Sequence, residues 1–450
     1  MLPERHGTRP ESRAPFPVSV RNCANPWHWV LITNDGDVMP CSHASGAVGN
    51  LRDNSIEEIW NGPVMREVRA SILKGEVHRV CGSSECPFQR VDPVFPERKE
   101  PLRIEGDFAR AFDEEWYLRE HPDVREAVAR CRLTSGLEHF IRHGRVEGRA
   151  YRLAPGQPSL APGGPDGPPP PAAVAGGGPC AAPERPVPNW LLGLLEYSQG
   201  ATILRARPVD VVMVVSTICN LHCVMCPHGM DRVVRPHNTP TDVMEGLESF
   251  LETASRICVS GLGEPMSAPA FWWLIDRSAL WGDRSFRVHS NGHLITPEGA
   301  ERLLKSGVTE MSISLDAATP GTYARIRGGD LESALAGISA LVRLRQGFPN
   351  KRMEVSINMT LMRENLGEAA AFIALGKGLG VDAVMFSQLF AFGDSPDWRV
   401  ERDGWEFVYA EQMLGRAPAE ARLHISKAKE FAEKVGMPVQ FFSSVLDYLK

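Results

Sequence analysis

The sequence lacks long apolar runs and a strong excess of either charge. No stretch of its 450 residues approaches the roughly 18 to 20 consecutive apolar positions of a membrane-spanning helix. The opening residues, MLPERHGTRPESR, also lack the apolar centre of an export signal. Lys and Arg total 49 against 55 Asp and Glu, which does not favour broad binding to nucleic acid or to anionic membranes. We therefore expect a cytoplasmic protein with no nucleic-acid or membrane partner.

Ten cysteines stand out in this setting. Because the cytosol keeps thiols reduced, they predict metal ligands rather than a disulfide framework. Most of them fall into two groups by spacing. These are Cys23, Cys41, Cys81 and Cys86, followed by Cys219, Cys223 and Cys226.

A stretch rich in proline and glycine divides the chain. From Pro155 to Pro188 more than half of the residues are Pro or Gly, a composition that predicts a linker because it cannot bury enough apolar surface to fold. We predict four segments: a small cysteine-containing domain in residues 1–100, a helical module in 107–150, the linker in 151–188 and a large domain in 189–450.

The large domain alternates strand-like and helical patterns. Apolar runs predict strands, and a helical stretch follows each of them. The predicted strands are Val209–Thr217, Arg256–Ser260, Phe286–Ser290, Glu310–Asp316, Arg352–Thr360 and Asp382–Gln388. These repeats predict an α/β fold with a parallel sheet curled into a partial (β/α)6 TIM-like barrel, where chemistry lies at the carboxyl ends of the strands.

The segment before the linker predicts two smaller units. Asp35-Gly36 is a turn signal between two strand-like runs, and a helical pattern follows that begins after Ser55 and ends at Gly75. Residues 107–150 predict three short helices. We expect a small α+β domain followed by a short helical module.

CNLHCVMCPHG, from Cys219 to Gly229, follows the first predicted strand of the large domain. Cages for zinc or for a cubane iron–sulfur cluster usually have four protein ligands, and this loop supplies three cysteines. His222 or His228 would complete a zinc site. The loop alone leaves open what fills the fourth position.

The spacing Cys219-x3-Cys223-x2-Cys226 on such a loop resembles the signature of the radical S-adenosylmethionine (radical SAM) enzymes. Three further stretches resemble the family's motifs in the expected order. They are SGLGEP (260–265), like the Gly-Gly-Glu motif, HSNG (289–292), like the Thr-Asn-Gly-type turn, and SISLDAATPGTYARIRGG (312–329), like the Ser-x-Asp segment with its downstream Arg.

This resemblance implies a cofactor pair and a reaction. In the family, three cysteines hold three irons of a [4Fe–4S] cluster, and the fourth iron binds the methionine part of SAM. Cys219, Cys223 and Cys226 are therefore the implied cluster ligands and catalytic residues, and the missing ligand is the active site. Reduction would cleave SAM to a 5′-deoxyadenosyl radical that abstracts hydrogen from a substrate.

The resemblance also implies residues on the SAM side of the site. Gly261 and Gly263 would let the backbone approach the SAM amino group, since a side chain would obstruct it. Glu264 would support that turn or the amino group. Ser290 and Asn291 would form the SAM-side turn of the third strand.

Ser314 and Arg327 are the candidates for binding the ribose hydroxyls and the methionine carboxylate, because Arg suits a two-bonded grip on a carboxylate. The plain alternative is a capping hydroxyl and a surface ion pair. Met225 departs from the family, which often has an aromatic residue there against the adenine.

The first cysteine group resembles the SPASM domain, which binds auxiliary [4Fe–4S] clusters. The resemblance rests on the hairpin turn, an Ile-Trp-Asn helix and the ligand candidates Cys23, Cys41, Cys81 and Cys86. SPASM domains typically carry more cysteines and follow the barrel, whereas this region precedes it. Four thiolates would also suit zinc. We expect either that the long linker lets this domain dock where a C-terminal SPASM domain would, or that the domain belongs to a tandem arrangement whose second copy is absent here.

Taken together, these patterns predict a radical SAM enzyme of the maturase type that modifies a peptide or protein. A reducing partner such as flavodoxin or ferredoxin would supply electrons. One alternative is a dehydrogenase or epimerase that acts on a sugar or polysaccharide precursor. Residues 107–150 favour this alternative, because they resemble a module of polysaccharide-associated proteins. The other is a non-catalytic metal-binding scaffold.

Overall fold

The structure is a computed structural model. It describes residues 23–81, 112–129, 135–140, 149–152, 188–230, 235–348, 353–391, 395–446 and 448. The candidate ligand Cys86 lies outside the described residues.

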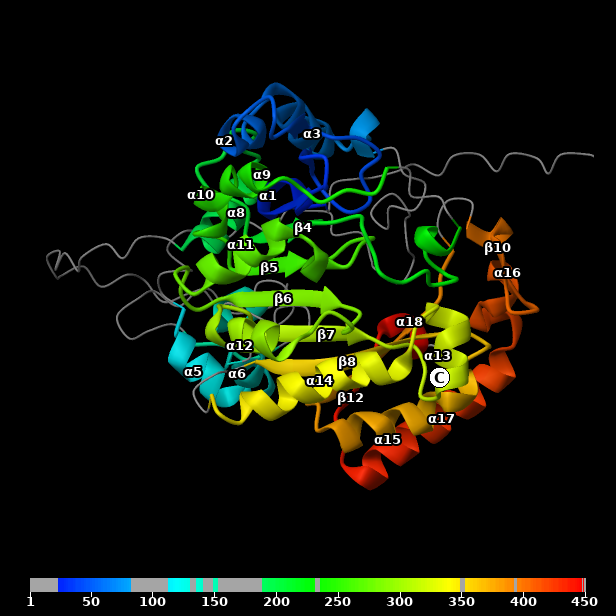
Figure 1. Cartoon of the computed structure of the whole chain (residues 1–450). Helices are drawn as coiled ribbons and strands as arrows, with labels where there is room; N and C mark the ends of the chain where they lie inside the picture. The colour runs from blue at the N-terminus through cyan, green and yellow to red at the C-terminus, as the bar shows by residue number, and fades with distance from the viewer. Residues whose placement is uncertain are drawn as a thin grey trace, which may run out of the picture.

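Six parallel strands form the centre of the fold (Figure 1). They are β4 (Asp210–Met213), β5 (Arg256–Val259), β6 (Ser285–Ser290), β7 (Glu310–Ser314), β8 (Glu354–Leu361) and β9 (Ala383–Gln388). Each strand pairs in parallel with the next one along the chain. The predicted α/β fold with a partial TIM-like barrel is confirmed.

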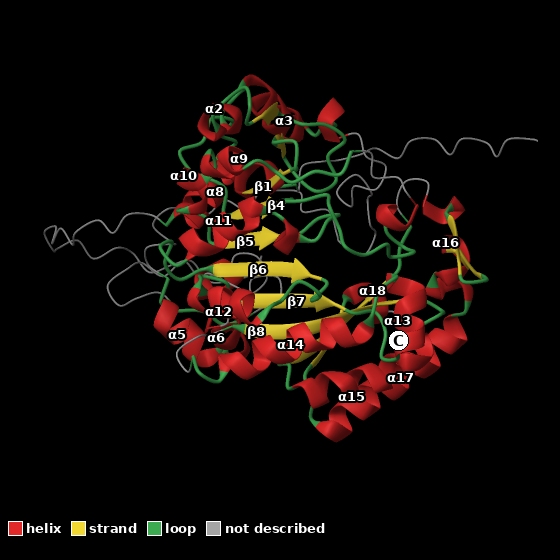
Figure 2. Ribbon diagram, in the orientation of Figure 1, coloured by secondary structure: helices red, strands yellow, loops and turns green. Residues whose placement is uncertain are grey.

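Helices connect these strands and lie around the sheet (Figure 2). They are α9 (Thr241–Glu245), α10 (Glu248–Leu251), α11 (Pro269–Ser278), α12 (Pro297–Lys305), α13 (Pro320–Arg327), α14 (Leu331–Arg345), α15 (Ala369–Leu379) and α17 (Pro418–Val435). Local signals set their ends: the Thr296 side chain accepts the Gly299 N–H at the start of α12. Gly380, with a φ of 73°, ends α15 in the left-handed conformation.

Strands from both ends of the chain extend this sheet. β12 (Val439–Phe441) pairs in parallel with β9, and α18 (Ser443–Leu446) follows it. At the other edge, β1 (Trp29–Ile32) pairs in parallel with β4. β2 (Asp37–Met39) and β3 (Gly49–Asn50) continue the sheet in antiparallel fashion. The predicted hairpin is therefore part of the barrel sheet rather than a detached unit.

The helical pattern after Ser55, predicted as one helix, forms two. α2 (Ile56–Trp60) begins with a capping box at Ser55, and α3 (Pro63–Lys74) begins after Gly62. The first residue of α3 is a proline, which lacks the N–H that would continue the preceding helix. The single-helix prediction was wrong because this proline starts a new helix.

Side chains of α2 and α3 anchor the N-terminal domain to the segment that leads into β4. Trp60 Nε1 donates to the Ala206 carbonyl at 2.8 Å. The Arg69 guanidinium is fully buried, donates to the Pro26 and Thr202 carbonyls at 2.9 Å each, and stacks over the Trp60 ring. Burial lowers the pKa of Arg69 to about 9, so the contacts must offset a real desolvation cost.

Three short helices precede the linker, as the sequence predicts. They are α5 (Glu114–Glu120), α6 (Pro122–Ala129) and α7 (Gly136–His139). Tyr117 is fully buried among them, in an apolar cluster that also contains Leu191 of α8 (Asn189–Ser198). The module therefore packs on the helix that begins the large domain. On its other side, α8 packs against α1 (Asn25–His28), where Trp27 meets Tyr197 edge-on.

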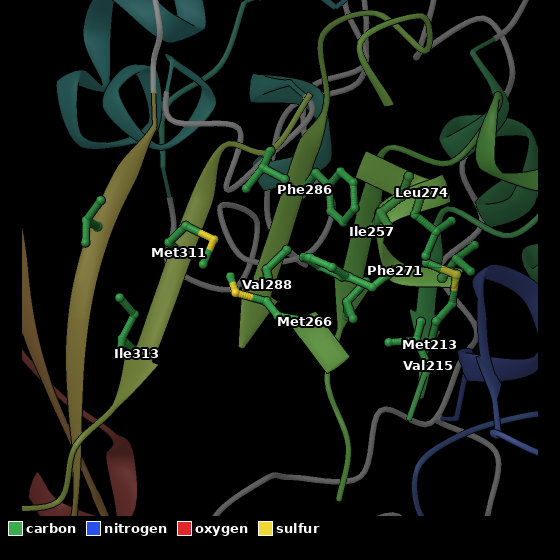
Figure 3. Packing of buried hydrophobic residues seen from close by; sticks show 14 of the residues in the cluster. Met213, Val215, Ile257, Met266, Phe271, Leu274, Phe286, Val288, Met311 and Ile313 are labelled. Carbon is green, nitrogen blue, oxygen red and sulfur yellow. The ribbon is translucent and has the colours of Figure 1, made fainter. Parts of the chain in front are cut away.

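The main hydrophobic core lies against the parallel strands (Figure 3). It combines alternate strand residues with side chains of α11 and of the turn before it, because side chains along a strand point to opposite faces. Labelled members are Met213, Val215, Ile257, Met266, Phe271, Leu274, Phe286, Val288, Met311 and Ile313.

A separate hairpin follows β9. It consists of β10 (Arg399–Arg402) and β11 (Trp405–Val408), which pair with each other in a two-stranded sheet, and α16 (Tyr409–Gln412) continues from it. None of the helices in the described parts of the chain is long and apolar enough to span a membrane.

The Arg69 anchor leads to a stability prediction. Arg69→Ala leaves buried carbonyls without a donor and opens a cavity beside Trp60, so we expect the free energy of unfolding to fall by about 3 kcal/mol. Arg66, exposed on the same helix, is the matched control. Arg66→Ala should change the free energy of unfolding by no more than about 0.5 kcal/mol. Denaturant unfolding checks both variants. If Arg69→Ala and Arg66→Ala have the same denaturation midpoint, Arg69 does not anchor the N-terminal domain.

Candidate functional site

The three cysteines lie on the loop that follows β4, at the carboxyl end of the parallel sheet. The Cys226 N–H donates to the Cys223 carbonyl at 3.0 Å, and the Gly229 N–H donates to the Cys226 carbonyl at 2.9 Å. A Cβ on Gly229 would lie 2.2 Å from the Cys223 carbonyl oxygen. Only glycine fits there. The sequence assigned Gly229 no role, although its place directly after the cysteines is a signal.

Burial makes these thiols hard to ionise. Cys223 is 7% exposed, and Cys219 and Cys226 are half-buried. Burial raises the pKa of Cys223 to about 12, and it also raises the pKa of the other two thiols. Each thiolate adds to the electrostatic cost of ionising its neighbours, so the three groups lie within electrostatic reach of one another. Bound metal cations would remove that cost.

Gly261 and Gly263 pack closely against the segment between β4 and the cysteines. Gly261 has a φ of 154°, and a Cβ there would lie 2.6 Å from Val214 Cγ1. A Cβ on Gly263 would lie 2.5 Å from the Ser216 carbonyl oxygen, which accepts the Gly263 N–H at 3.1 Å. Close packing thus requires both glycines, against a side chain at Gly261 and against backbone at Gly263, a reason that the sequence did not reveal.

Glu264 ties the turn after β5 to the turn after β6. Its carboxylate is 1% exposed and accepts hydrogen bonds from Ser290 Oγ at 2.9 Å and from the Asn291 N–H at 2.7 Å. Burial raises the pKa of Glu264, although these hydrogen bonds oppose the rise. Asn291 in turn donates to Asn220 Oδ1 at 2.7 Å and faces Cys219 Sγ at 3.9 Å. The structure brings these predicted residues together against the cysteine loop.

Arg327 forms an ion pair at the same end of the sheet. Its Nη1 donates to Asp316 Oδ2 at 2.9 Å, and the two residues are 8% and 1% exposed. The plain alternative of a surface ion pair was wrong, because this pair is buried. Burial alone would lower the pKa of Arg327, but negative charge on Cys223 and Asp316 raises it overall. A permanent cation therefore lies beside the cysteine loop.

Asp316 is a site residue that the sequence pattern included but did not single out. It is a non-glycine residue with a φ of 60°, a conformation that costs of order 1 kcal/mol or more. Its carboxylate accepts the Thr360 N–H at 2.6 Å, and its carbonyl accepts Asn365 Nδ2 at 2.8 Å. These bonds aim the carboxylate at Arg327. The Ser-x-Asp pattern was the available signal.

Two further polar side chains adjoin Arg327. Arg327 acts electrostatically on Tyr323, whose hydroxyl lies 2.8 Å from His293 Nε2. Burial raises the pKa of Tyr323 to about 12, so the phenol stays neutral at ordinary pH. Ser314, the last residue of β7, is half-buried.

The described cysteines of the N-terminal domain lie in separate turns. Cys23 precedes α1, Cys41 follows β2 and Cys81 ends a short 3-10 helix. The Ser45 N–H donates to the Val80 carbonyl at 2.8 Å, which holds the turn after Cys41 beside the helix that contains Cys81.

Three thiols on one short loop suit an iron–sulfur cluster, because a four-iron cluster holds each cysteine on a different iron. Within the described ranges, no three His, Cys, Asp or Glu side chains are grouped as the ligands of one metal ion. His228, a candidate zinc ligand, is buried with Nε2 unpaired among the described atoms, and burial lowers its pKa.

Two protein families match this chain. Residues 213–375 match the radical SAM superfamily, and residues 23–87 match SPASM, an iron–sulfur cluster-binding domain. The first range contains Cys219, Glu264 and Arg327, and the second contains all four candidate ligands of the N-terminal domain.

Curated relatives match part of this chain. An AdoMet-dependent heme synthase of Methanosarcina barkeri is 33% identical over 187 residues, which are 40% of this chain and 50% of the relative. A GTP 3',8-cyclase of Alkaliphilus oremlandii is 26% identical over 47% of this chain and 65% of the relative. Mycofactocin maturase MftC of Mycobacterium ulcerans is 29% identical over 38% and 45%. The chain thus spans about half to two thirds of these relatives.

Solved structures resemble the fold at low identity. Streptococcus suis SuiB bound to S-adenosylmethionine is 13% identical, with a TM-score of 0.42 and coverage of 57% of each chain. Native anSMEcpe with bound AdoMet is 18% identical, with a TM-score of 0.37 and coverage of 52% of this chain and 64% of that chain.

The two matched families and the cysteine loop after β4 agree with one another. A radical SAM domain and a SPASM domain imply [4Fe–4S] clusters and SAM as the cofactors of this chain. Residues 213–375 thus match a radical SAM domain, and a region that matches a SPASM domain lies ahead of it in the sequence.

Proposed function

We propose that this chain reductively cleaves SAM and directs the resulting radical to a hydrogen atom of a peptide or protein substrate. The observation that carries this proposal is the loop from Cys219 to Gly229. Its three thiols interact electrostatically, and its Asn220 accepts a hydrogen bond from Asn291 in the turn after β6.

Cys219, Cys223 and Cys226 are the proposed ligands of the [4Fe–4S] cluster. When bound, that cluster supplies the electron that breaks the bond between the sulfur and the 5′ carbon of SAM. The burial of Cys223 keeps water from that side of the site, as radical chemistry requires. Arg327 holds a positive charge near the thiolates and so lowers the cost of their negative charge.

The turns after β5, β6 and β7 are the proposed SAM-binding elements. Glu264 orients the turn that contains Gly261 and Gly263, and it also fixes Ser290 and Asn291. Ser314 and Arg327 are proposed to bind the ribose hydroxyls and the methionine carboxylate. Arg327 uses Nη1 for Asp316, and its buried Nε has no partner among the described atoms. A buried guanidinium with an unused donor suits an anionic ligand.

The N-terminal domain is proposed to hold an auxiliary [4Fe–4S] cluster on Cys23, Cys41, Cys81 and Cys86. That cluster would accept an electron from the substrate or help to position it. The pairing of β1 with β4 supports this role, because β4 leads directly into the SAM-site cysteine loop.

A peptide substrate is supported by three observations. One of the relatives is named a maturase, and the chain combines a barrel with a SPASM domain. Apolar side chains also lie exposed after the carboxyl ends of three strands, at Ile218, Leu262 and Phe390. Such side chains suit the apolar residues of an extended peptide. A flavodoxin or ferredoxin is the proposed electron donor.

The first test is SAM cleavage by the anaerobically reconstituted chain with a chemical reductant. We expect formation of 5′-deoxyadenosine, and we expect Cys223→Ala to reduce it by at least about a thousandfold, because chemistry at a metal centre fails without its ligands. Cys258, in β5 and outside the loop, is the matched control. Cys258→Ala should retain activity and iron. A wild-type chain that binds zinc and forms no 5′-deoxyadenosine would be the non-catalytic scaffold.

A second prediction concerns Glu264. Glu264→Gln replaces one acceptor oxygen by a donor facing Ser290 or the Asn291 N–H, so we expect SAM binding to weaken about tenfold. Glu298→Gln, at an exposed position on α12, should leave binding unchanged. Equilibrium dialysis of SAM with the reconstituted chain measures both. Equal affinity in the two variants would remove Glu264 from the SAM-binding elements.

The substrate class is tested by mass spectrometry. The reduced enzyme and SAM are incubated separately with short peptides encoded beside its gene, with sugar nucleotides and with porphyrins. We expect a mass change confined to a peptide. A change confined to a sugar nucleotide or a porphyrin would contradict the peptide proposal and leave SAM cleavage standing.

A further inference from the structure

We infer that the β10–β11 hairpin is a clasp that holds the cysteine loop in place, with Arg402 as its positioning residue. The clasp joins the loop to the end of α13. That the cysteine loop binds a cluster rests on the proposed function, whereas the clasp itself consists of contacts between residues of this chain.

Arg402 joins two segments that are far apart in the sequence. Its Nη1 donates to the Arg325 carbonyl at 2.7 Å and to the Ala324 carbonyl at 3.3 Å, both in the last turn of α13. Its Nη2 donates to the His222 carbonyl, between Cys219 and Cys223. One guanidinium therefore satisfies carbonyls at a helix end and a carbonyl in the cysteine loop.

Apolar packing supports the same contact. Val224, between Cys223 and Cys226, is fully buried, and its N–H donates to the Ile326 carbonyl at 2.9 Å. Both residues belong to a small apolar cluster, separate from the main core, that the hairpin helps to build. Its other buried members are Met362, Leu389, Trp398, Phe407 and Tyr409, and Met225 packs against it. The cysteine loop is therefore held by α13 and by the hairpin segment.

Gly328 shows how closely Arg402 fits. This glycine ends α13 with a φ of 72°, and a Cβ there would lie 2.9 Å from Arg402 Nη1 and 3.0 Å from its Cζ. A side chain at this position would push the guanidinium away from its carbonyl partners. The left-handed helix end and the Arg402 contact thus both require glycine.

The clasp lies outside the family match. The radical SAM match ends at residue 375, and the hairpin occupies residues 399–408, between β9 and α17. The barrel motifs alone therefore do not account for how this loop is held, and the hairpin supplies the additional contacts.

The test measures thiol reactivity in the full chain before cluster reconstitution. Arg402→Gln should raise the alkylation rates of Cys223 and Cys226 about tenfold, as expected for the loss of hydrogen bonds that hold the loop closed. Arg399→Gln is the matched control, since Arg399 lies on the same hairpin, is exposed, and pairs only with the exposed Glu406 in the described parts of the chain. It should leave the rates unchanged.

Cys258 reports on the rest of the fold in the same experiment. It lies in β5, away from the clasp, so its alkylation should stay slow in Arg402→Gln. A rise at Cys258 would indicate general unfolding, and Arg402→Lys then takes the place of Arg402→Gln. Lysine keeps the charge but not the forked geometry, and it should raise the rates at Cys223 and Cys226 with Cys258 unchanged.

A glycine pair provides an independent test. Gly328→Ala should mimic Arg402→Gln, and the two together should be no worse than either alone, because they break one contact. Gly380→Ala carries the same left-handed strain at the end of α15, where a Cβ would meet only Val342 Cγ1 at 3.5 Å. It should not expose the cysteines. Additive effects of Gly328→Ala and Arg402→Gln would contradict the clasp. Equal effects of Gly328→Ala and Gly380→Ala on the alkylation rates would contradict it as well.

Iron retention links the clasp to the proposed function. After reconstitution, Arg402→Gln should lose iron to a chelator about tenfold faster than Arg399→Gln does. Equal alkylation rates and equal iron loss in these two variants would overturn the clasp. If alkylation rises as expected but the wild-type chain cleaves no SAM, the clasp stands and the proposed function fails.

Discussion

The burial of three thiols on one short loop is the constraint around which the site is built. Ionising Cys223 in this environment is costly, and ionising its neighbours adds to that cost. A buried cation, Arg327, lowers this cost, and backbone and side-chain hydrogen bonds fix the loop. The loop has no fourth cysteine, which leaves room for a ligand that the protein does not supply. The turn after β5 contains Gly261 and Gly263 because it packs directly on the segment that leads into this loop.

The order of the domains along the chain differs from their arrangement in space. The SPASM domain precedes the barrel in sequence, yet its β1 strand joins the barrel sheet beside β4. Arg69 and Trp60 then fasten its helices to the segment leading into β4. A proline- and glycine-rich segment separates the two domains in the sequence, and it is long enough for the chain to return to the barrel. The domain therefore adjoins the strand that leads into the cysteine loop.

Local signals made much of this architecture predictable. Apolar runs predicted the parallel strands within a few residues, and Ser55 begins a helix as the sequence predicts. Non-local features were not predictable: the pairing of β1 with β4, the positive φ of Asp316, and the reach of Arg402 to His222 all depend on residues far apart in the chain. In the candidate site, the sequence motifs predicted that Glu264 lies close to its neighbouring candidate residues, and it does. It did not show that Gly229 must be glycine.

The most direct measurement of the central claim is electron paramagnetic resonance of the reduced chain with and without SAM. A variant with the four N-terminal cysteines Cys23, Cys41, Cys81 and Cys86 replaced by alanine isolates the loop site. The account predicts one reduced [4Fe–4S] signal whose shape changes when SAM is added, because SAM binds the open iron. An absence of any iron–sulfur signal after reconstitution, or a signal that SAM leaves unchanged, would contradict it.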